Sequence, residues 1–278
     1  MTEPFRINWR RELAQAVAFC AADGAALMLV SGPNDSGVRS FMKVLDSEIQ
    51  AAVGDSLLLS LHSSMLECQY PEGIADAIIQ ACGGASPSEY ASPLVSIAAD
   101  NKVGGDFTVE NISVELGESQ ADRARRQREQ IAAMRAAVER VASSRHIILT
   151  LSDWDKADRM LARWVMDVLW ERQLSSVAGS VKCIVAWDSI GSDAFLEQRR
   201  AMFSAEIALP ERYAGDSVSH AIDDIVSVLR QTEGLEDERT AAAAARVLVT
   251  ASEMRPIRVI NGLAAVLTTS AQYSKGPA

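Results

Sequence analysis

Two glycines five residues apart follow a short apolar run near the start of the chain. Residues 31–40 read SGPNDSGVRS, in which Gly32 and Gly37 have the spacing of the phosphate-binding loop G-x-x-x-x-G-K-[S/T]. In that motif, backbone N–H groups wrap the phosphates, the lysine reaches the outer phosphates and the hydroxyl holds Mg²⁺. Val38 stands at the lysine position and Arg39 at the hydroxyl position. The pattern predicts a phosphate cradle that lacks its cation and its metal anchor.

Two interpretations of this loop stay open. Glycines at this spacing can also be ordinary turn residues between a strand and a helix. If the loop does hold a nucleotide, Arg39 or Ser40 has to replace the missing phosphate ligands. The predicted loop residues are Gly32, Asn34, Ser36, Gly37, Val38, Arg39 and Ser40.

A pair of carboxylates follows a second apolar run. Residues 146–151 read HIILTL, and Asp153 and Asp155 come directly after them. The two side chains could form a metal pair, but aspartates at a strand-to-helix junction also cap free N–H groups of the helix. We predict Asp153 and Asp155 as a vestigial site and expect neither a bound metal nor a catalytic residue.

The surrounding sequence supplies the elements that would position these residues. Apolar runs between turn signals predict buried strands over 25–31, 56–61, 146–151, 181–187 and 205–210. Helical spacing predicts helices over 9–22, 39–52, 73–82, 120–143 and 157–173, and an alternating stretch predicts an exposed strand or a small hairpin over 107–116. Residues 83–105 are predicted to be irregular. We expect an α/β domain over 1–212 whose parallel sheet is flanked by helices.

Beyond Pro210 the strand pattern stops. Residues 218–230, 237–251 and 257–273 predict three helices, so we expect a small all-helical lid domain over 213–278.

Composition limits the class of protein. The net charge of −10 and pI near 4.9 disfavour broad attraction to nucleic acid. The helix predicted over 120–143 nevertheless carries several arginines. They could form a solvated face, a contact to nucleic acid or a contact to an acidic partner. Four cysteines without a C-x-x-C pair predict buried free thiols. No secretion signal or apolar span is recognisable, so we expect a cytoplasmic protein without a membrane partner.

These features, in this order, resemble the STAND family, the signal-transducing branch of the AAA+-like P-loop ATPases, and in particular its degenerate, inactive members. The stretch SDWDKA over 152–157 is similar to the family's D-[T/S]-[F/W/Y]-E-K-A motif. The resemblance implies that Ser152 replaces the Walker B aspartate and Asp155 the glutamate that polarises water. In the alternative register, Asp153 is the metal residue one position late, and its carboxylate points away from the ion unless the strand end bends.

The resemblance and the missing groups together suggest a non-hydrolytic signalling or assembly module of a bacterial signalling or defence-type system. Its partners would be effector or sensor proteins on other chains, or further copies of itself, and it would need no cofactor beyond residual ATP or ADP binding. A weak ATPase or nucleotide-gated switch with rearranged ligands is the alternative. A third hypothesis is an AAA+-like adaptor in DNA transposition or processing.

Overall fold

The computed structural model describes residues 9–33, 35–84, 120–187, 193–233 and 237–273. Within these residues, five parallel strands form one sheet in the order β2-β3-β4-β1-β5. The strands are β1 (Ala26–Ser31), β2 (Ser56–His62), β3 (His146–Ser152), β4 (Val181–Trp187) and β5 (Ala205–Ala208). The predicted α/β architecture with a parallel sheet is therefore confirmed.

The apolar runs form strands because helices cover both faces of the sheet. Every residue of β4 is buried, and alternate residues of β1 enter two different cores. Leu27 and Leu29 face one core, whereas Met28 and Val30 face the other. This two-sided burial explains why the strands are continuous apolar runs rather than alternating ones.

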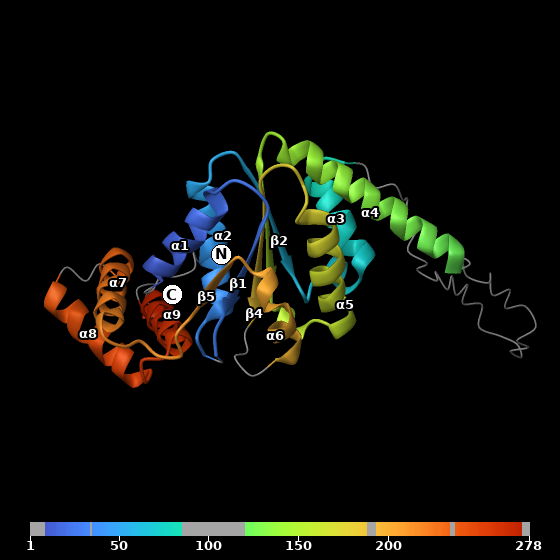
Figure 1. Ribbon diagram of the computed structural model, residues 1–278. Helices are drawn as coiled ribbons and strands as arrows, with labels where there is room; N and C mark the ends of the chain where they lie inside the picture. The colour runs from blue at the N-terminus through green and yellow to red at the C-terminus, as the bar shows by residue number, and fades with distance from the viewer. Residues whose placement is uncertain (1–8, 34, 85–119, 188–192, 234–236, 274–278) are drawn as a thin grey trace, which may run out of the picture.

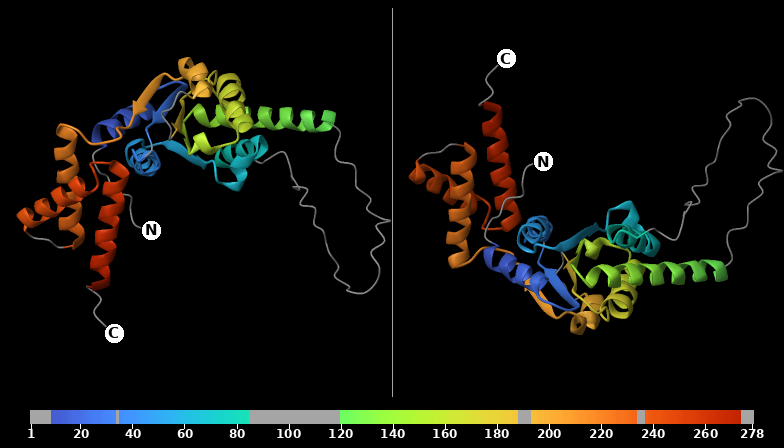
Figure 2. Two further views of the ribbon diagram at one scale, coloured as in Figure 1. Left: turned by 90° about the horizontal axis from the view of Figure 1, so that it is seen from below. Right: turned by 90° about the horizontal axis from the view of Figure 1, so that it is seen from above.

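Helices pack on each face (Figure 1). One face carries α1 (Arg10–Ala21) and α2 (Val38–Ala52), and the other carries α3 (Pro71–Ala81), α4 (Gln120–Ala142), α5 (Arg159–Arg163) and η3 (Trp164–Leu174). Shorter elements are η1 (Leu66–Gln69), η2 (Trp154–Lys156), α6 (Ala194–Arg199) and η4 (Arg200–Met202). The amino-terminal part of α4 extends beyond the body of the domain (Figures 1 and 2).

One predicted helix differs in the structure, and two predicted segments lie wholly or mostly outside the described residues. The helix predicted over 157–173 is a short α5 that continues as the π-helix η3, and it begins later because the Asp158 carboxylate accepts the N–H group of Met160 at 2.8 Å. A π-helix forms i→i+5 rather than i→i+4 hydrogen bonds, and over so short a segment the apolar periodicity does not separate the two. The strand predicted over 107–116 lies outside the described residues, as does all of the segment 83–105 except Gly83 and Gly84.

Three helices form a second body beside β5 and α1 (Figures 1 and 2). They are α7 (Asp216–Glu233), α8 (Glu238–Ala251) and α9 (Pro256–Tyr273). Apolar side chains of these helices form a separate buried cluster, which also includes Tyr213. Ile260 packs against both this cluster and the core under α2. We call α7, α8 and α9 the lid.

Two composition-based expectations can be compared with the structure. Each of the four cysteines is buried, as predicted. In the described part of the chain, no helix combines the length and the apolar character needed to cross a membrane.

Candidate functional site

The two predicted motifs meet at one edge of the sheet. Both follow the carboxyl ends of parallel strands, the glycine loop after β1 and Asp153 after β3. The carboxyl end of β2 lies at the same edge, because His62 is in register with Ser152 of β3. Carboxyl ends of strands in an open α/β sheet are where ligands bind. The topology therefore places the predicted residues where chemistry is expected.

The glycine loop is closed by its own residues. The N–H group of Ser36 donates to the Pro33 carbonyl at 3.0 Å, and the Ser36 side chain is fully buried. A Cβ atom on Gly32 would stand 2.1 Å from the Ser36 Oγ. Gly37 has φ of +84°, and a Cβ atom there would lie 3.1 Å from the Trp9 ring. The loop's packing requires both glycines whether or not a phosphate is present.

Replacing Gly32 by alanine tests that packing. We expect Gly32→Ala to lower the free energy of unfolding by about 1–2 kcal/mol, because Ser36 must leave its buried position to make room. Gly54→Ala is the matched control, since a Cβ atom there meets nothing within 4 Å and φ is not positive. Urea unfolding of both variants measures the difference. Equal stability of the two variants would contradict this account.

The positions that depart from the motif have distinct surroundings. Val38 is buried and packs in the core under α2, so an apolar side chain stands at the lysine position. Arg39 is half-exposed and its Nη2 lies 2.5 Å from the Asp153 Oδ2. Ser40 is partly buried in the first turn of α2, and Asn34 lies outside the described residues. Of the predicted loop residues that the structure describes, Arg39 is the one that reaches the second motif.

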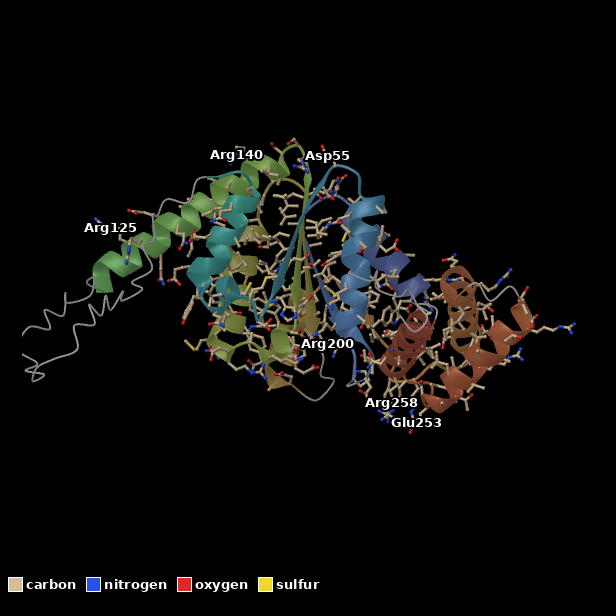
Figure 3. The ribbon with its side chains drawn as sticks, turned by 180° about the vertical axis from the view of Figure 1, so that it is seen from behind. Asp55, Arg125, Arg140, Arg200, Glu253 and Arg258 are labelled. Atoms are coloured by element: carbon tan, nitrogen blue, oxygen red, sulfur yellow. The ribbon has the colours of Figure 1, made fainter. Side chains whose placement is uncertain are left out.

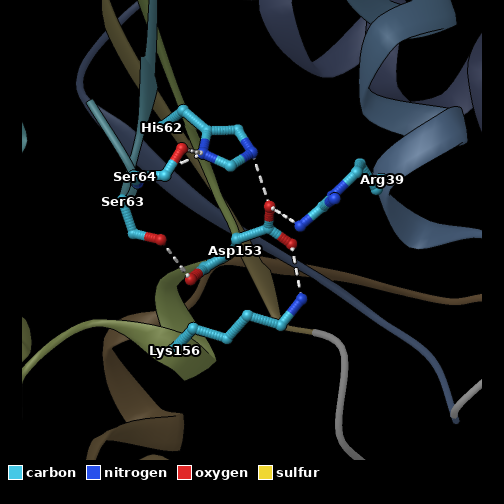
Figure 4. Close-up of polar contacts among 6 residues, drawn as sticks. All are labelled: Arg39, His62, Ser63, Ser64, Asp153 and Lys156. Atoms are coloured by element: carbon cyan, nitrogen blue, oxygen red, sulfur yellow. Dashed lines mark hydrogen bonds and ion pairs between the residues drawn. The ribbon is translucent and has the colours of Figure 1, made fainter.

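Asp153 turns toward the glycine loop because the chain bends after β3. Its φ is +59°, in the left-handed region. This bend supplies the condition under which a carboxylate one position late can still face the loop. Its side chain is 2% exposed, with Oδ2 also 2.5 Å from the His62 Nε2 and Oδ1 3.1 Å from the Lys156 Nζ (Figure 4). We call Asp153, Arg39, His62 and Lys156 the Asp153 cluster.

His62 is oriented by the turn that follows β2. Its Nδ1 accepts the N–H group of Ser64 at 3.2 Å and lies 2.8 Å from the Ser64 Oγ (Figure 4). An accepting Nδ1 places the proton of a neutral imidazole on Nε2, which faces Asp153. Ser63 joins the same two strands, because its Oγ donates to the Asp153 carbonyl at 2.8 Å.

The cluster keeps Asp153 ionised. Burial acts to raise the pKa of this carboxyl group, but hydrogen bonds and positive charge from Arg39 and Lys156 outweigh it and hold the pKa below 3.8. A carboxylate that is stabilised by neighbouring cations is a poor proton acceptor. The geometry therefore describes a charge-neutralising cluster rather than a general base.

Asp155 does not join this cluster. It lies in η2 with a partly buried side chain, and its Oδ1 has no hydrogen-bond partner among the described residues. The capping alternative for Asp153 is wrong, because its side chain makes no capping bond at η2, and the following helix is capped by Asp158. Within the described residues, Asp153 belongs to the cluster and Asp155 does not, so the two predicted carboxylates do not act as a pair.

The residues at this edge do not fit a magnesium ion. Mg²⁺ needs oxygen ligands, whereas Arg39 offers only donors at the position of the ligating hydroxyl. Both oxygens of Asp153 already face cationic or N–H groups. No group of three or more His, Cys, Asp or Glu side chains suited to a metal occurs in the described residues.

Backbone strain gathers at this edge and at the part of the lid that adjoins it. Among the described residues, four non-glycine residues have positive φ: Asp35, Asp153, Glu253 and Met254. Asp35 belongs to the glycine loop, and the last two form the turn between α8 and α9. Figure 3 shows Glu253 and Arg258 near the sheet edge opposite Asp55 and Arg140. Strained residues of this kind cluster at functional sites.

A second polar group lies at the other edge of the sheet. A cavity of about 460 Å³ there is lined by residues that include Asp23, Arg145, His146 and Ser180, and the Ser180 Oγ lies 2.8 Å from the His146 Nδ1. It sits at the amino ends of the strands, which are not where ligands bind in open α/β sheets. We therefore take the Asp153 edge as the candidate site.

Comparisons with known proteins give the class of fold. No family model and no curated protein matches the sequence. Solved structures with the same fold include Cdc6p from Pyrobaculum aerophilum, with a TM-score of 0.54, 12% identity and coverage of 99% of this chain and 64% of that one. They also include Drosophila ORC bound to DNA (0.50, 10%, 95% and 62%) and a Walker-type ATPase of Pyrococcus abyssi (0.50, 12%, 99% and 73%).

The chain thus has an AAA+-like P-loop NTPase fold with a helical lid. It spans less than two thirds of the Cdc6p and ORC chains that it matches. Identities of 10–12% establish the fold alone. Because one of these structures is bound to DNA, the expectation that nucleic acid is not a partner receives no support from the comparisons.

Proposed function

We propose that this chain is a non-hydrolytic AAA+-like module of the STAND type that acts by binding other proteins. The observation that carries the proposal is the ion pair between Arg39 and Asp153. In an active site of this fold, a hydroxyl group at the position of Arg39 and a carboxylate at the position of Asp153 share a magnesium ion. Here a guanidinium group joins the two positions, and the chain itself supplies the positive charge.

The energetic argument supports inactivity. Phosphoryl transfer is catalysed almost entirely by positioning and charge stabilisation, and one charged stabiliser can be worth about 10³–10⁵ in rate. This chain has Val38 at the lysine position and Arg39 at the metal-ligand position, and Asp153 is engaged by three neighbours. The combined loss leaves little rate acceleration.

The biological setting follows from the resemblance stated above. A module without turnover contributes by presenting surfaces, so its partners are effector or sensor chains or further copies of itself. We place it in a bacterial signalling or defence-type system and in the cytoplasm.

Two other functions also have observations in their favour. The chain retains the strand, glycine loop and helix of a nucleotide site, which favours a weak ATPase or nucleotide-gated switch. The projecting part of α4 carries the exposed Arg125 (Figure 3), and Arg128 of the same helix is also exposed. Because one neighbour of the fold is bound to DNA, these arginines favour a DNA-processing adaptor.

Thermal melts with and without Mg-ATP and Mg-ADP test the proposal. A ligand at 100 times its Kd stabilises a protein by about 2.7 kcal/mol, which corresponds to roughly 5–10 °C for a chain of this size. We expect a shift well below this range and no phosphate release above the rate without protein. A magnesium-dependent shift of that size, together with phosphate release, would replace this proposal by the weak ATPase.

Arg39→Ser provides the informative variant, because it restores a hydroxyl at the metal-ligand position and frees one side of Asp153. If the ion pair excludes magnesium, Mg-ATP should stabilise Arg39→Ser more than the original chain. Lys43→Ser is the matched control, since it removes a cation of the same helix whose side chain does not belong to the Asp153 cluster. A gain shared by both variants would show that general charge, and not the pair, is responsible.

A further inference from the structure

The lid contacts the glycine loop at Asp35. The Arg255 Nη1 donates to the Asp35 Oδ2 at 3.0 Å, and the N–H group of Ile257 donates to the Asp35 carbonyl at 3.2 Å. The Nε of Arg258 lies 3.9 Å from the same Oδ2. We call Asp35, Arg255, Ile257 and Arg258 the loop–lid contact.

The start of α9 favours a negative group at this place. The helix begins with Pro256, which has no N–H group, so Ile257 supplies its first donor without a helical partner. The positive end of the helix dipole adds to the charge of the two arginines. Asp35 accepts from both of these groups, because its carbonyl bonds to Ile257 and its carboxylate bonds to Arg255.

Acidic residues hold the two arginines near the loop. One of these acidic residues lies in the segment between β5 and α7, which we call the linker. Arg255 also lies 3.3 Å from Glu211 and 3.6 Å from Glu253, and Arg258 lies 3.1 Å from Glu253. The side chain of Arg255 is 20% exposed, so solvent reaches it only in part. The linker is fixed to the same turn, because the N–H group of Tyr213 donates to the Met254 carbonyl at 2.8 Å.

The backbone on both sides of the contact is strained. Asp35, Glu253 and Met254 have φ of 72°, 53° and 58°, in the left-handed region that disfavours residues with a side chain. Aspartate tolerates this region better than most residues because its short polar side chain can bond locally. Each turn also has local hydrogen bonds, such as that from the Met254 N–H group to the Val249 carbonyl at 3.0 Å, and the contacts between loop and lid add to them.

We propose that Asp35 is a built-in anion that holds the lid against the glycine loop, so that the lid stays docked without a bound nucleotide. The inference rests on the proposed function in one respect: a chain that binds no triphosphate must supply the negative charge between loop and lid itself. Both side chains of the pair remain partly exposed, which makes the contact sensitive to ionic strength.

Hydrogen exchange of the nucleotide-free protein tests the inference, with Asp35→Asn as the variant. Asparagine keeps the size and the tolerance of left-handed φ but removes the charge. We expect amides of residues 254–260 to exchange about three to ten times faster in Asp35→Asn, as loss of a partly exposed charged hydrogen bond implies. Amides of β4 should be unchanged. Raising the salt concentration should accelerate the same lid amides in the original protein and much less in the variant.

The variant should still fold, because Arg10 of α1 contacts Asp224 of α7 and Ile260 packs into both cores. Glu211→Gln is the matched control, since it removes a partner of Arg255 that lies outside the loop, and it should leave exchange within about twofold. Unchanged exchange in Asp35→Asn, or equal acceleration in Glu211→Gln, would overturn the inference. The assay contains no nucleotide, so Mg-ATP binding would contradict the proposed function while leaving this result readable.

Discussion

Trp9→Ala is expected to lower the free energy of unfolding by about 3–5 kcal/mol, the usual cost of removing a buried tryptophan side chain. The Trp9 indole is 1% exposed and meets Phe41 edge to face, with ring centroids 5.6 Å apart. It also covers the outer side of the loop at Gly37. Its removal therefore opens a cavity between the start of α1 and the first turn of α2. Urea unfolding followed by circular dichroism measures the loss.

Trp9→Phe is the control for this prediction. The Trp9 Nε1 has no hydrogen-bond partner among the described residues, so phenylalanine loses no bond and keeps the edge-to-face contact. We expect it to cost less than half as much as alanine. A similar cost for both variants would show that the indole's shape, rather than the volume that it fills, is what the loop requires.

Asp153→Asn has the second large effect, a loss of about 2–3 kcal/mol near neutral pH, because the buried carboxylate loses its ion pairs with Arg39 and Lys156. The folded-state pKa of Asp153 lies below the unfolded value of 3.8. Its contribution to stability is therefore fully present above that value and is lost as the pH falls through the folded-state pKa. The stability difference between the two proteins should shrink at acid pH. Urea unfolding between pH 7 and pH 2.5 measures it.

Asp155→Asn is the matched control for the acid effect, because this neighbouring carboxylate does not belong to the Asp153 cluster. We expect little change in stability and the same pH dependence as in the original protein. If Asp153→Asn shows a constant deficit down to pH 2.5, the low pKa and the cluster that explains it are wrong.

The sheet could be predicted because its strands leave a direct signal. A strand buried on both faces is mostly apolar, and β1, β3 and β4 are, although β3 and β4 also bury the polar residues Thr150 and Lys182. The order of glycine loop, helix and later carboxylate predicted the two motifs, but it did not predict that Arg39 reaches Asp153. Helix boundaries were less certain, as the late start of α5 and the π-helical η3 show.

His62 and the loop–lid contact could not be predicted in the same way. His62 reaches Asp153 only because β2 and β3 are parallel neighbours in a register that pairs His62 with Ser152. Asp35 and Arg255 are 220 residues apart, and no periodicity links them. The available signals were weak: a histidine that ends an apolar run, and an acid inside a loop that should attract anions.

The charge that neutralises Asp153 arrives as part of the polypeptide. A divalent ion reaches its ligands by diffusion and departs again, so a chelator or a fall in free magnesium can empty an ordinary site of this fold. The Arg39 guanidinium group has no dissociation rate of its own. The pair between the first helix turn after β1 and the end of β3 can open and close, because the Arg39 side chain is about half exposed, but its two charges stay within reach of each other for as long as the native state lasts.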